Sequence, residues 1–200
     1  MIFLGPLYQQ LTTAYADKIN HFPLIRLVVF SLDKTILYLL VLMLVRFGWR
    51  LLARKPFRFW HEVGVVLVSG YVILLLMLTV FRDVYYPWQL HFFWDRPLSV
   101  INFTPFTETA KLWYGLTRFD FWYQSLGNVL WFVPLGFGYG LLSKRPRLIG
   151  AVGLGVGLSL TIETLQFLLI SGVADIDDVI FNGLGAVLGY VAVRLTRKRL

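Results

Sequence analysis

The sequence predicts an all-α integral membrane protein with about five transmembrane helices. Of its 200 residues, 58% are hydrophobic and only 15% are charged. The apolar residues gather in stretches that approach the roughly 20 residues a helix needs to cross a bilayer. A soluble domain of this length cannot bury so much apolar surface. We therefore expect a single membrane domain over residues 1–200.

Four apolar stretches, each delimited by charges or proline, are predicted to span the membrane. They cover about 62–81, 124–142, 148–170 and 176–194.

A further span precedes these four, and two registers fit it. It runs either from about 24 to 45, with Asp33 and Lys34 inside, or from about 35 to 53. We favour a register between the two, in which the adjacent charged pair is an interfacial helix start. Residues 1–23 are expected to lie in the membrane interface.

Lysine and arginine gather in three segments that five spans would place on one side, predicted to be the cytoplasm. These residues are Arg46, Arg50, Arg54, Lys55 and Arg58; Lys144, Arg145 and Arg147; and Arg194, Arg197, Lys198 and Arg199. The N-terminus then lies outside and the C-terminus in the cytoplasm. Topology thus explains the formal net charge of +8, and membrane lipids rather than nucleic acid are the expected partners.

The predicted outer loop at about 83–123 is rich in Trp, Tyr and Phe. These side chains favour the headgroup layer, so we expect the loop to lie partly in the interface. Cysteine is absent, which excludes disulfides, zinc–thiolate sites and cysteine nucleophiles. His21, His61 and His91 are far apart, and we expect neither a metal site nor a cofactor.

Glycines recur four residues apart in the last three spans, a spacing that lets helix backbones approach closely. The pairs are Gly136 and Gly140, Gly153 and Gly157, and Gly185 and Gly189. They predict a tightly packed core of spans three to five.

Polar residues recur in the outer halves of the spans, where they are costly and need partners. Glu163 and Gln166 share a helix face with Ser159, and Asn182 continues a stripe from Asp178. Glu163 would lie about 10 Å below the outer surface at the rise of a helix. The agreement in side and depth predicts a polar pocket open to the outer leaflet. Its expected ligand-binding residues are Arg82, Asn102, Asn128, Glu163, Gln166, Asp175, Asp178 and Asn182.

Simpler roles compete for several of these residues. Asp175 fits a helix cap and Asp177 a solvated charge. Asn128 and Gln166 could join helices through hydrogen bonds instead of binding a ligand. Glu163 is hardest to explain structurally, because a buried carboxylate must be paired or protonated.

Four motifs in order resemble the VanZ-like family of bacterial membrane proteins, over about residues 75–194. They are NFTPF (102–106), NVLWFVPLGF (128–137), IETLQ (162–166) and DIDDVIFNGLGAVLGY (175–190). Matching positions are Asn102, Pro105, Phe106, Asn128, Pro134, Gly136, Glu163, Gln166, Asp175, Asp178 and Asn182.

The resemblance implies a multi-pass protein of the bacterial plasma membrane. The family's namesake is associated with low-level resistance to teicoplanin, a lipoglycopeptide that binds peptidoglycan precursors outside the cell. Relatives often carry a basic residue shortly before the first Asp of the last motif, where this chain has Ser171, Gly172 and Val173. If that residue holds an anionic headgroup, Arg82 or Arg96 must replace it here, or the ligand differs.

Three functions are compatible with these observations. The favoured one is a non-catalytic envelope protein that binds a lipid, a lipid-linked cell-wall precursor or a lipoglycopeptide. The alternative is an intramembrane enzyme acting on an outer-leaflet lipid or polyprenyl-linked substrate, with Glu163 and Asp178 as catalytic carboxylates and Mg²⁺ as an optional cofactor. A proton-coupled lipid transporter is least favoured, because no inverted repeat is visible. The sequence does not determine the oligomeric state.

Overall fold

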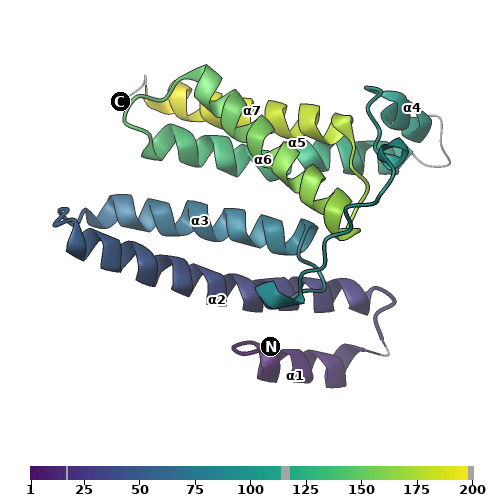
Figure 1. The fold of residues 1–200 in the computed structure, drawn as a ribbon, viewed down its shortest axis with the longest axis horizontal. Helices are drawn as coiled ribbons and strands as arrows, with labels where there is room; N and C mark the ends of the chain where they lie inside the picture. Colours follow the sequence, from purple (N-terminus) through teal and green to yellow (C-terminus); the bar gives the residue numbers. More distant parts are fainter. Residues whose placement is uncertain (17, 114–117, 198–200) are drawn as a thin grey trace. The chain divides into compact units, whose positions relative to one another are not determined.

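The computed structural model describes residues 1–16, 18–113 and 118–197. The described chain is helical, and its only bridge of the β type is an isolated parallel one between Asn102 and Asp175. Its elements, drawn in Figure 1, are α1 (Gly5–Tyr15), α2 (Phe22–Leu52), α3 (Phe59–Thr79), η1 (Pro87–Gln89), η2 (Leu98–Val100), α4 (Thr107–Trp113), α5 (Arg118–Leu142), α6 (Leu148–Leu169) and α7 (Ile176–Arg197).

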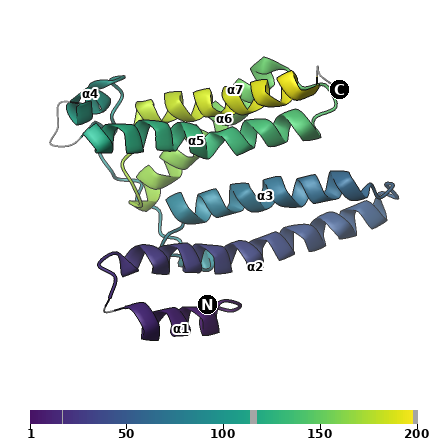
Figure 2. The ribbon, with the colours of Figure 1, turned by 180° about the vertical axis from the view of Figure 1, so that it is seen from behind.

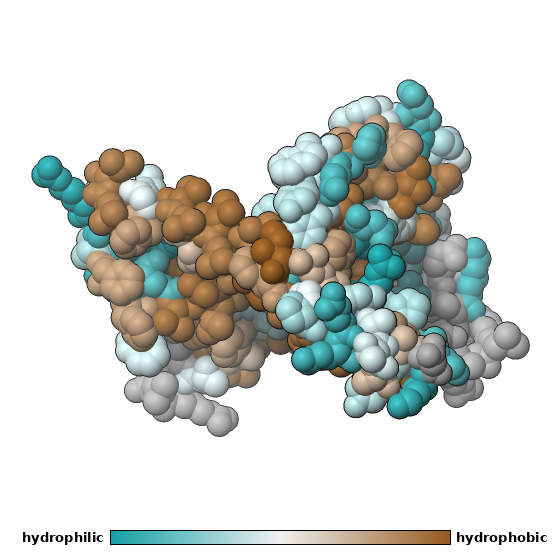
Figure 3. Space-filling view, turned by 90° about the horizontal axis from the view of Figure 1, so that it is seen from below, coloured by the Kyte–Doolittle hydropathy of each residue, from teal (hydrophilic) through white to brown (hydrophobic). Residues whose placement is uncertain are grey.

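Five helices are long and apolar enough to cross a membrane: α2, α3, α5, α6 and α7. The predicted all-α multi-pass fold is therefore confirmed. Each helix satisfies its own backbone hydrogen bonds, which is what a lipid environment demands. Apolar side chains cover much of the face shown in Figure 3, as expected of helices that face lipid.

The chain forms two compact units, residues 1–90 and 91–200, and each is described by itself. The first unit contains α1, α2 and α3, with α2 packed along α3 as a helical hairpin (Figure 2). The loop 53–58 joins the two long helices, and Arg54 takes a left-handed φ of 48° at this turn.

The structure corrects the expectation for Asp33 and Lys34. No helix starts at this pair, because α2 begins at Phe22 and continues through both residues to Leu52. Both side chains have an exposed fraction of 0%. Burial of a charge requires compensating partners. Asp33 and Lys34 have different partners.

The Asp33 carboxylate binds the backbone that leads into α1. Its oxygens accept the N–H groups of Ile2, Phe3 and Leu4 at 2.8, 2.7 and 2.6 Å. These N–H groups belong to the segment just before α1, so the carboxylate holds the N-terminal segment against α2.

The Lys34 ammonium binds the chain that leaves α3. It donates to the carbonyl oxygens of Arg82 and Val84, both at 3.2 Å, and to that of Phe81. A cation is favourable where a helix leaves carbonyl groups unpaired. Two adjacent residues of α2 therefore hold two other segments of the first unit.

In the second unit, α7 packs against both α5 and α6. Glycines permit the close approach of α7 to α5. A Cβ on Gly136 would lie 1.8 Å from the Ala186 carbonyl oxygen, and one on Gly189 would lie 2.0 Å from that of Val133. The predicted tight packing is confirmed for α5 and α7.

The glycine prediction is wrong for α6. A Cβ at Gly153 or Gly157 would meet no atom of the described chain within 4 Å. Gly155 makes the close contact instead, since its Cβ would lie 2.5 Å from the Cβ of Ala186. The spacing of four was right for a helix face, but it selected the face of α6 that points away from α7.

Candidate functional site

The candidate site is built where the segment after η2 meets the start of α7. Asn102 donates its backbone N–H to the Ala174 carbonyl and accepts the N–H of Ile176, both at 3.0 Å. Its side-chain amide donates to Asp175 Oδ1 at 2.9 Å. Backbone and side chain together therefore fix the position of Asp175.

Asp175 also caps α7, as predicted. Its Oδ1 accepts the backbone N–H of Asp177 at 2.9 Å, which satisfies one of the free N–H groups of the first turn. Its own N–H donates to Glu163 Oε2 at 2.9 Å. Asp175 thus connects the loop, α7 and α6.

Glu163 lies on the inner face of α6 with an exposed fraction of 7%. Within the described residues, its carboxylate accepts that single hydrogen bond from Asp175. A buried carboxylate can accept several hydrogen bonds and is costly to bury with few of them. It therefore retains capacity for a further donor.

The first turn of α7 contributes a second pair. Asp178 Oδ1 accepts the side-chain amide of Asn128 on α5 at 2.5 Å. This contact agrees with the prediction that Asn128 joins helices through hydrogen bonding.

Deeper along the same face of α7, Asn182 donates its amide to Ser159 Oγ on α6 at 2.8 Å. Both residues are buried, and the Asn182 carbonyl oxygen has no partner in the described chain. The two predicted stripes, on α6 and α7, therefore meet at Ser159 and Asn182, while Asp178 of the α7 stripe binds α5 instead.

The expectation of a solvated Asp177 is wrong, since its exposed fraction is 3%. Its Oδ1 accepts the N–H of Phe106 at 2.6 Å, and its Oδ2 accepts the Thr109 hydroxyl at 2.5 Å. Phe106 has a left-handed φ of 62°, a conformation that a non-glycine residue keeps only when surrounding contacts hold it. Asp177 fixes the loop before α4, and its position at a helix start gave no signal of this role.

Gln166 is buried beside the turn that ends α6. Its backbone carbonyl accepts the N–H of Ser171 at 3.1 Å. A Cβ on Gly172 would lie 2.8 Å from the Cδ atom of the Gln166 side chain. Gln166 lines neither cavity described below, so its geometry favours a role in holding the turn 170–172.

Two predicted cations lie elsewhere. Arg96 donates to the Phe167 carbonyl at 2.5 Å and lies 4.9 Å from the centroid of the Phe167 ring. It therefore binds the last turn of α6. Arg82 belongs to the first unit, where it is exposed and donates to the Leu78 carbonyl at 3.0 Å. Neither arginine lines the site cavities.

Two open cavities meet at Asn102 and Asp175. The polar one, about 430 Å³, is also lined by Ser99, Gln124 and Asp178. The apolar one, about 370 Å³, contains Glu163 in a wall otherwise formed mainly by apolar side chains such as Trp94, Leu160 and Phe167. Among the described residues that line either cavity there is no Lys or Arg.

This combination can hold an amphipathic molecule. Carboxylates and amides in the polar cavity present acceptors to hydroxyl or amine groups, and the apolar groove can cover a hydrocarbon chain. Among the described residues, no three His, Asp or Glu side chains gather as a metal site would require.

The fold and the site define a multi-pass helical membrane protein whose polar cluster joins its last helices to the preceding loop. The chain belongs to the VanZ/LLP1 family, whose match extends over residues 68–197. It is similar to Protein VanZ of Enterococcus faecium, with 29% identity over 134 residues, which cover 67% of this chain and 75% of that protein. No solved structure matches the chain.

Proposed function

We propose that the protein binds an amphipathic envelope molecule in the two cavities of the second unit and thereby lowers susceptibility to glycopeptides such as teicoplanin. The ligand class comprises lipids, lipid-linked cell-wall precursors and lipoglycopeptides. The observation that carries this proposal is the shared wall: Asn102 and Asp175 line both the polar cavity and the apolar groove.

The charge of the site narrows the headgroup. Asp175 and Asp178 line the polar cavity without a described cation among the lining residues. A phosphate would be repelled there, because like charges at short range disfavour each other. Sugar hydroxyls or an amine would instead donate to the carboxylates, and these charge-assisted hydrogen bonds are the strong ones. Within this ligand class, a glycosylated or amine-bearing head on an acyl chain fits best, and a precursor whose sugar is joined to its lipid through phosphate fits less well.

Glu163 lies where head and chain would meet. It lines the apolar groove, and its one described hydrogen bond comes from the N–H of Asp175. A donor on the bound molecule would complete its coordination. Replacing the Glu163 carboxyl group should therefore weaken binding more than it disturbs the fold.

The test uses full-length protein reconstituted in lipid nanodiscs, with binding of teicoplanin and of a lipid-linked disaccharide-peptide precursor measured in parallel. We expect Glu163→Gln and Asp178→Asn to weaken binding about tenfold each, the loss of one charge-assisted hydrogen bond. Asp83→Asn, which removes an exposed carboxylate of the first unit, is the matched control. Unchanged binding in both site variants, with unchanged teicoplanin susceptibility of cells, would reject the proposal.

An enzymatic function remains the alternative, because Glu163 and Asp178 are two carboxylates of different surroundings near a groove that suits a lipid. Incubating the purified protein with the same precursor, with and without a chelator, separates the two. Release of a product that Glu163→Gln abolishes would replace the binding proposal by catalysis.

A further inference from the structure

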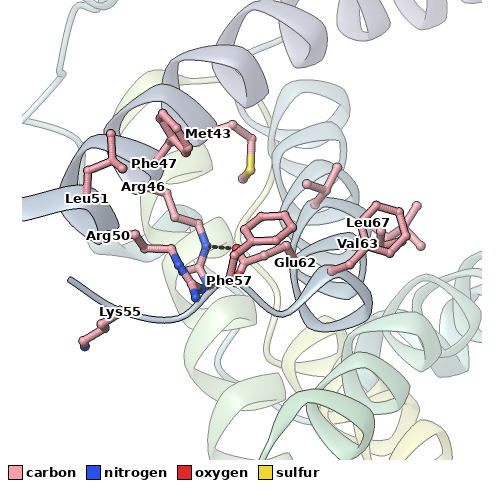
Figure 4. A pocket seen from close by; sticks show the side chains of 12 residues that line it. Met43, Arg46, Phe47, Arg50, Leu51, Lys55, Phe57, Glu62, Val63 and Leu67 are labelled. Carbon is pink, nitrogen blue, oxygen red and sulfur yellow. Dashed lines mark hydrogen bonds and ion pairs between the residues drawn. The ribbon is translucent and has the colours of Figure 1, made fainter. Parts of the chain in front are cut away.

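A separate cavity of about 450 Å³ opens between the last turns of α2 and the first turns of α3, wholly inside the first unit. Figure 4 shows Arg46 and Arg50 of α2 directed toward Glu62 of α3. Most of this region precedes the residues that match the family.

Positive charges outnumber negative charges in this cavity. Arg46 binds both oxygens of Glu62, at 2.7 and 3.2 Å, and Arg50 binds the same carboxylate and the neutral Pro56 carbonyl oxygen. These side chains are 26%, 14% and 13% exposed for Arg46, Arg50 and Glu62. Two guanidinium groups thus share one carboxylate in a largely covered position. An uncompensated charge with so little water is costly, and an anion would relieve that cost.

A third cation lies in the cavity lining. Lys55 belongs to the loop between the helices, and its ammonium lies 3.9 Å from the centroid of the Trp49 ring. The lining therefore contains Arg46, Arg50 and Lys55 against Glu62, an excess of positive charge that favours an anionic group.

The rest of the cavity is apolar, and its walls are open to the surroundings. Phe47, Leu51, Phe57 and Leu67 line it and are all largely exposed. Apolar walls of this kind favour a hydrocarbon chain over water. A soluble anion would use the cations alone and leave these walls uncovered.

We propose that this cavity binds one anionic phospholipid, with the phosphate at the arginines and Lys55 and an acyl chain along the apolar wall. Basic pockets between membrane helices suit anionic headgroups in this way. Under the predicted topology, the lipid belongs to the cytoplasmic leaflet. This inference does not rest on the proposed function, because all its residues lie in the first unit.

A purely structural role for the cluster makes a different prediction. If Glu62 only joins α2 to α3, then Glu62→Gln weakens the hairpin and has no specific effect on lipid choice. If the cavity holds a lipid phosphate, Glu62 competes with it, and Glu62→Gln raises the preference for anionic lipid. The sign of this change separates the two roles.

The experiment measures lipid retained by full-length protein from nanodiscs of equal phosphatidylglycerol and phosphatidylethanolamine, using native mass spectrometry. We expect wild type to retain phosphatidylglycerol preferentially. The double variant Arg50→Gln/Lys55→Gln should reduce that preference about 25-fold, from about fivefold for each cation. The matched control Lys144→Gln/Arg145→Gln removes the same charge from an exposed loop of the second unit and should keep it.

Several outcomes overturn the proposal: no preference in wild type, equal loss in both double variants, or an unchanged or lost preference in Glu62→Gln. If a variant fails to fold, photolabelling of the wild-type protein still tests the proposal. Photoreactive phosphatidylglycerol should label peptides within 43–67 more than those around 144–147. Excess glycerol 3-phosphate should leave that labelling unchanged; competition by it would point to a soluble phosphate instead.

Discussion

The hydroxyl of Tyr85 donates to Asp33 Oδ2 at 2.5 Å, in a position where the aspartate is fully buried and Tyr85 is 8% exposed. The same oxygen accepts the N–H of Ile2. One carboxylate thus holds together the N-terminal segment, α2 and the chain that follows α3.

Replacing Asp33 by Asn should release the N-terminal segment. The amide keeps one acceptor oxygen but turns its NH₂ toward the donors of residues 2–4. We expect a loss of about 3 kcal/mol in the free energy of unfolding, since hydrogen bonds to a charged group are the costly ones to lose. Hydrogen exchange of residues 2–15 should rise. Asp95→Asn, which removes an exposed carboxylate of the second unit, is the control, and equal exchange in both variants would contradict this role of Asp33.

Tyr85 should ionise only at unusually high pH. Burial, and then the hydrogen bond to Asp33, raises the pKa of Tyr85 above its ordinary value. A raised pKa in the fold means that the stabilisation is complete below the unfolded value of about 10 and is lost as pH rises through the folded value. The difference in phenolate absorbance between wild type and Tyr85→Phe measures this titration. A Tyr85 signal at the ordinary pH would refute the prediction.

Glycine positions on α6 and α7 should differ sharply in how far alanine destabilises the protein. Gly189→Ala places a methyl group 2.0 Å from the Val133 carbonyl oxygen, so α5 and α7 must separate. We expect a loss of about 3 kcal/mol. Gly153→Ala meets no neighbour and should change stability by less than about 0.5 kcal/mol. Unfolding in mixed micelles measures both, and similar losses would show that the α5–α7 contact is not as close as described.

Substitutions at Ser159 and Asn182 should have non-additive effects on the free energy of unfolding. Ser159→Ala leaves the buried Asn182 amide without its acceptor, and Asn182→Leu leaves the Ser159 hydroxyl without its donor. Each should cost about 2 kcal/mol, whereas the double variant should cost no more than either, because both unpaired groups are gone. A double-variant cycle on the free energy of unfolding tests this. Simple addition of the two losses would mean that the hydrogen bond contributes nothing.

The sequence was sufficient for the spans because a bilayer requires long apolar helices, and that requirement is visible in hydropathy alone. It was insufficient for α2. Asp33 and Lys34 look like an interfacial pair in a local window. Their partners are backbone groups at residues 2–4 and 81–84 and the hydroxyl of Tyr85, which no local pattern reveals.

In the candidate site, too, the sequence predicted which residues share a helix face but not the contacts between distant segments. The stripes on α6 and α7 placed Glu163 and Asn182 on inward faces, because helical spacing fixes which residues share a face. The spacing could not reveal that Asp177 is buried against Phe106, just before α4, and Thr109, inside α4. It also could not decide which glycines of α6 meet α7, since a face defined within one helix has no direction until its neighbour is known.

The bond between Asn102 and Asp175 joins residues 73 positions apart, and this separation has a consequence for biogenesis. During synthesis the loop at Asn102 emerges early, while its partners belong to the start of the last helix. The candidate site therefore closes only after α7 has been made and inserted. A chain truncated before α7 would contain most of its membrane helices and no site, so any activity of this site would report complete synthesis.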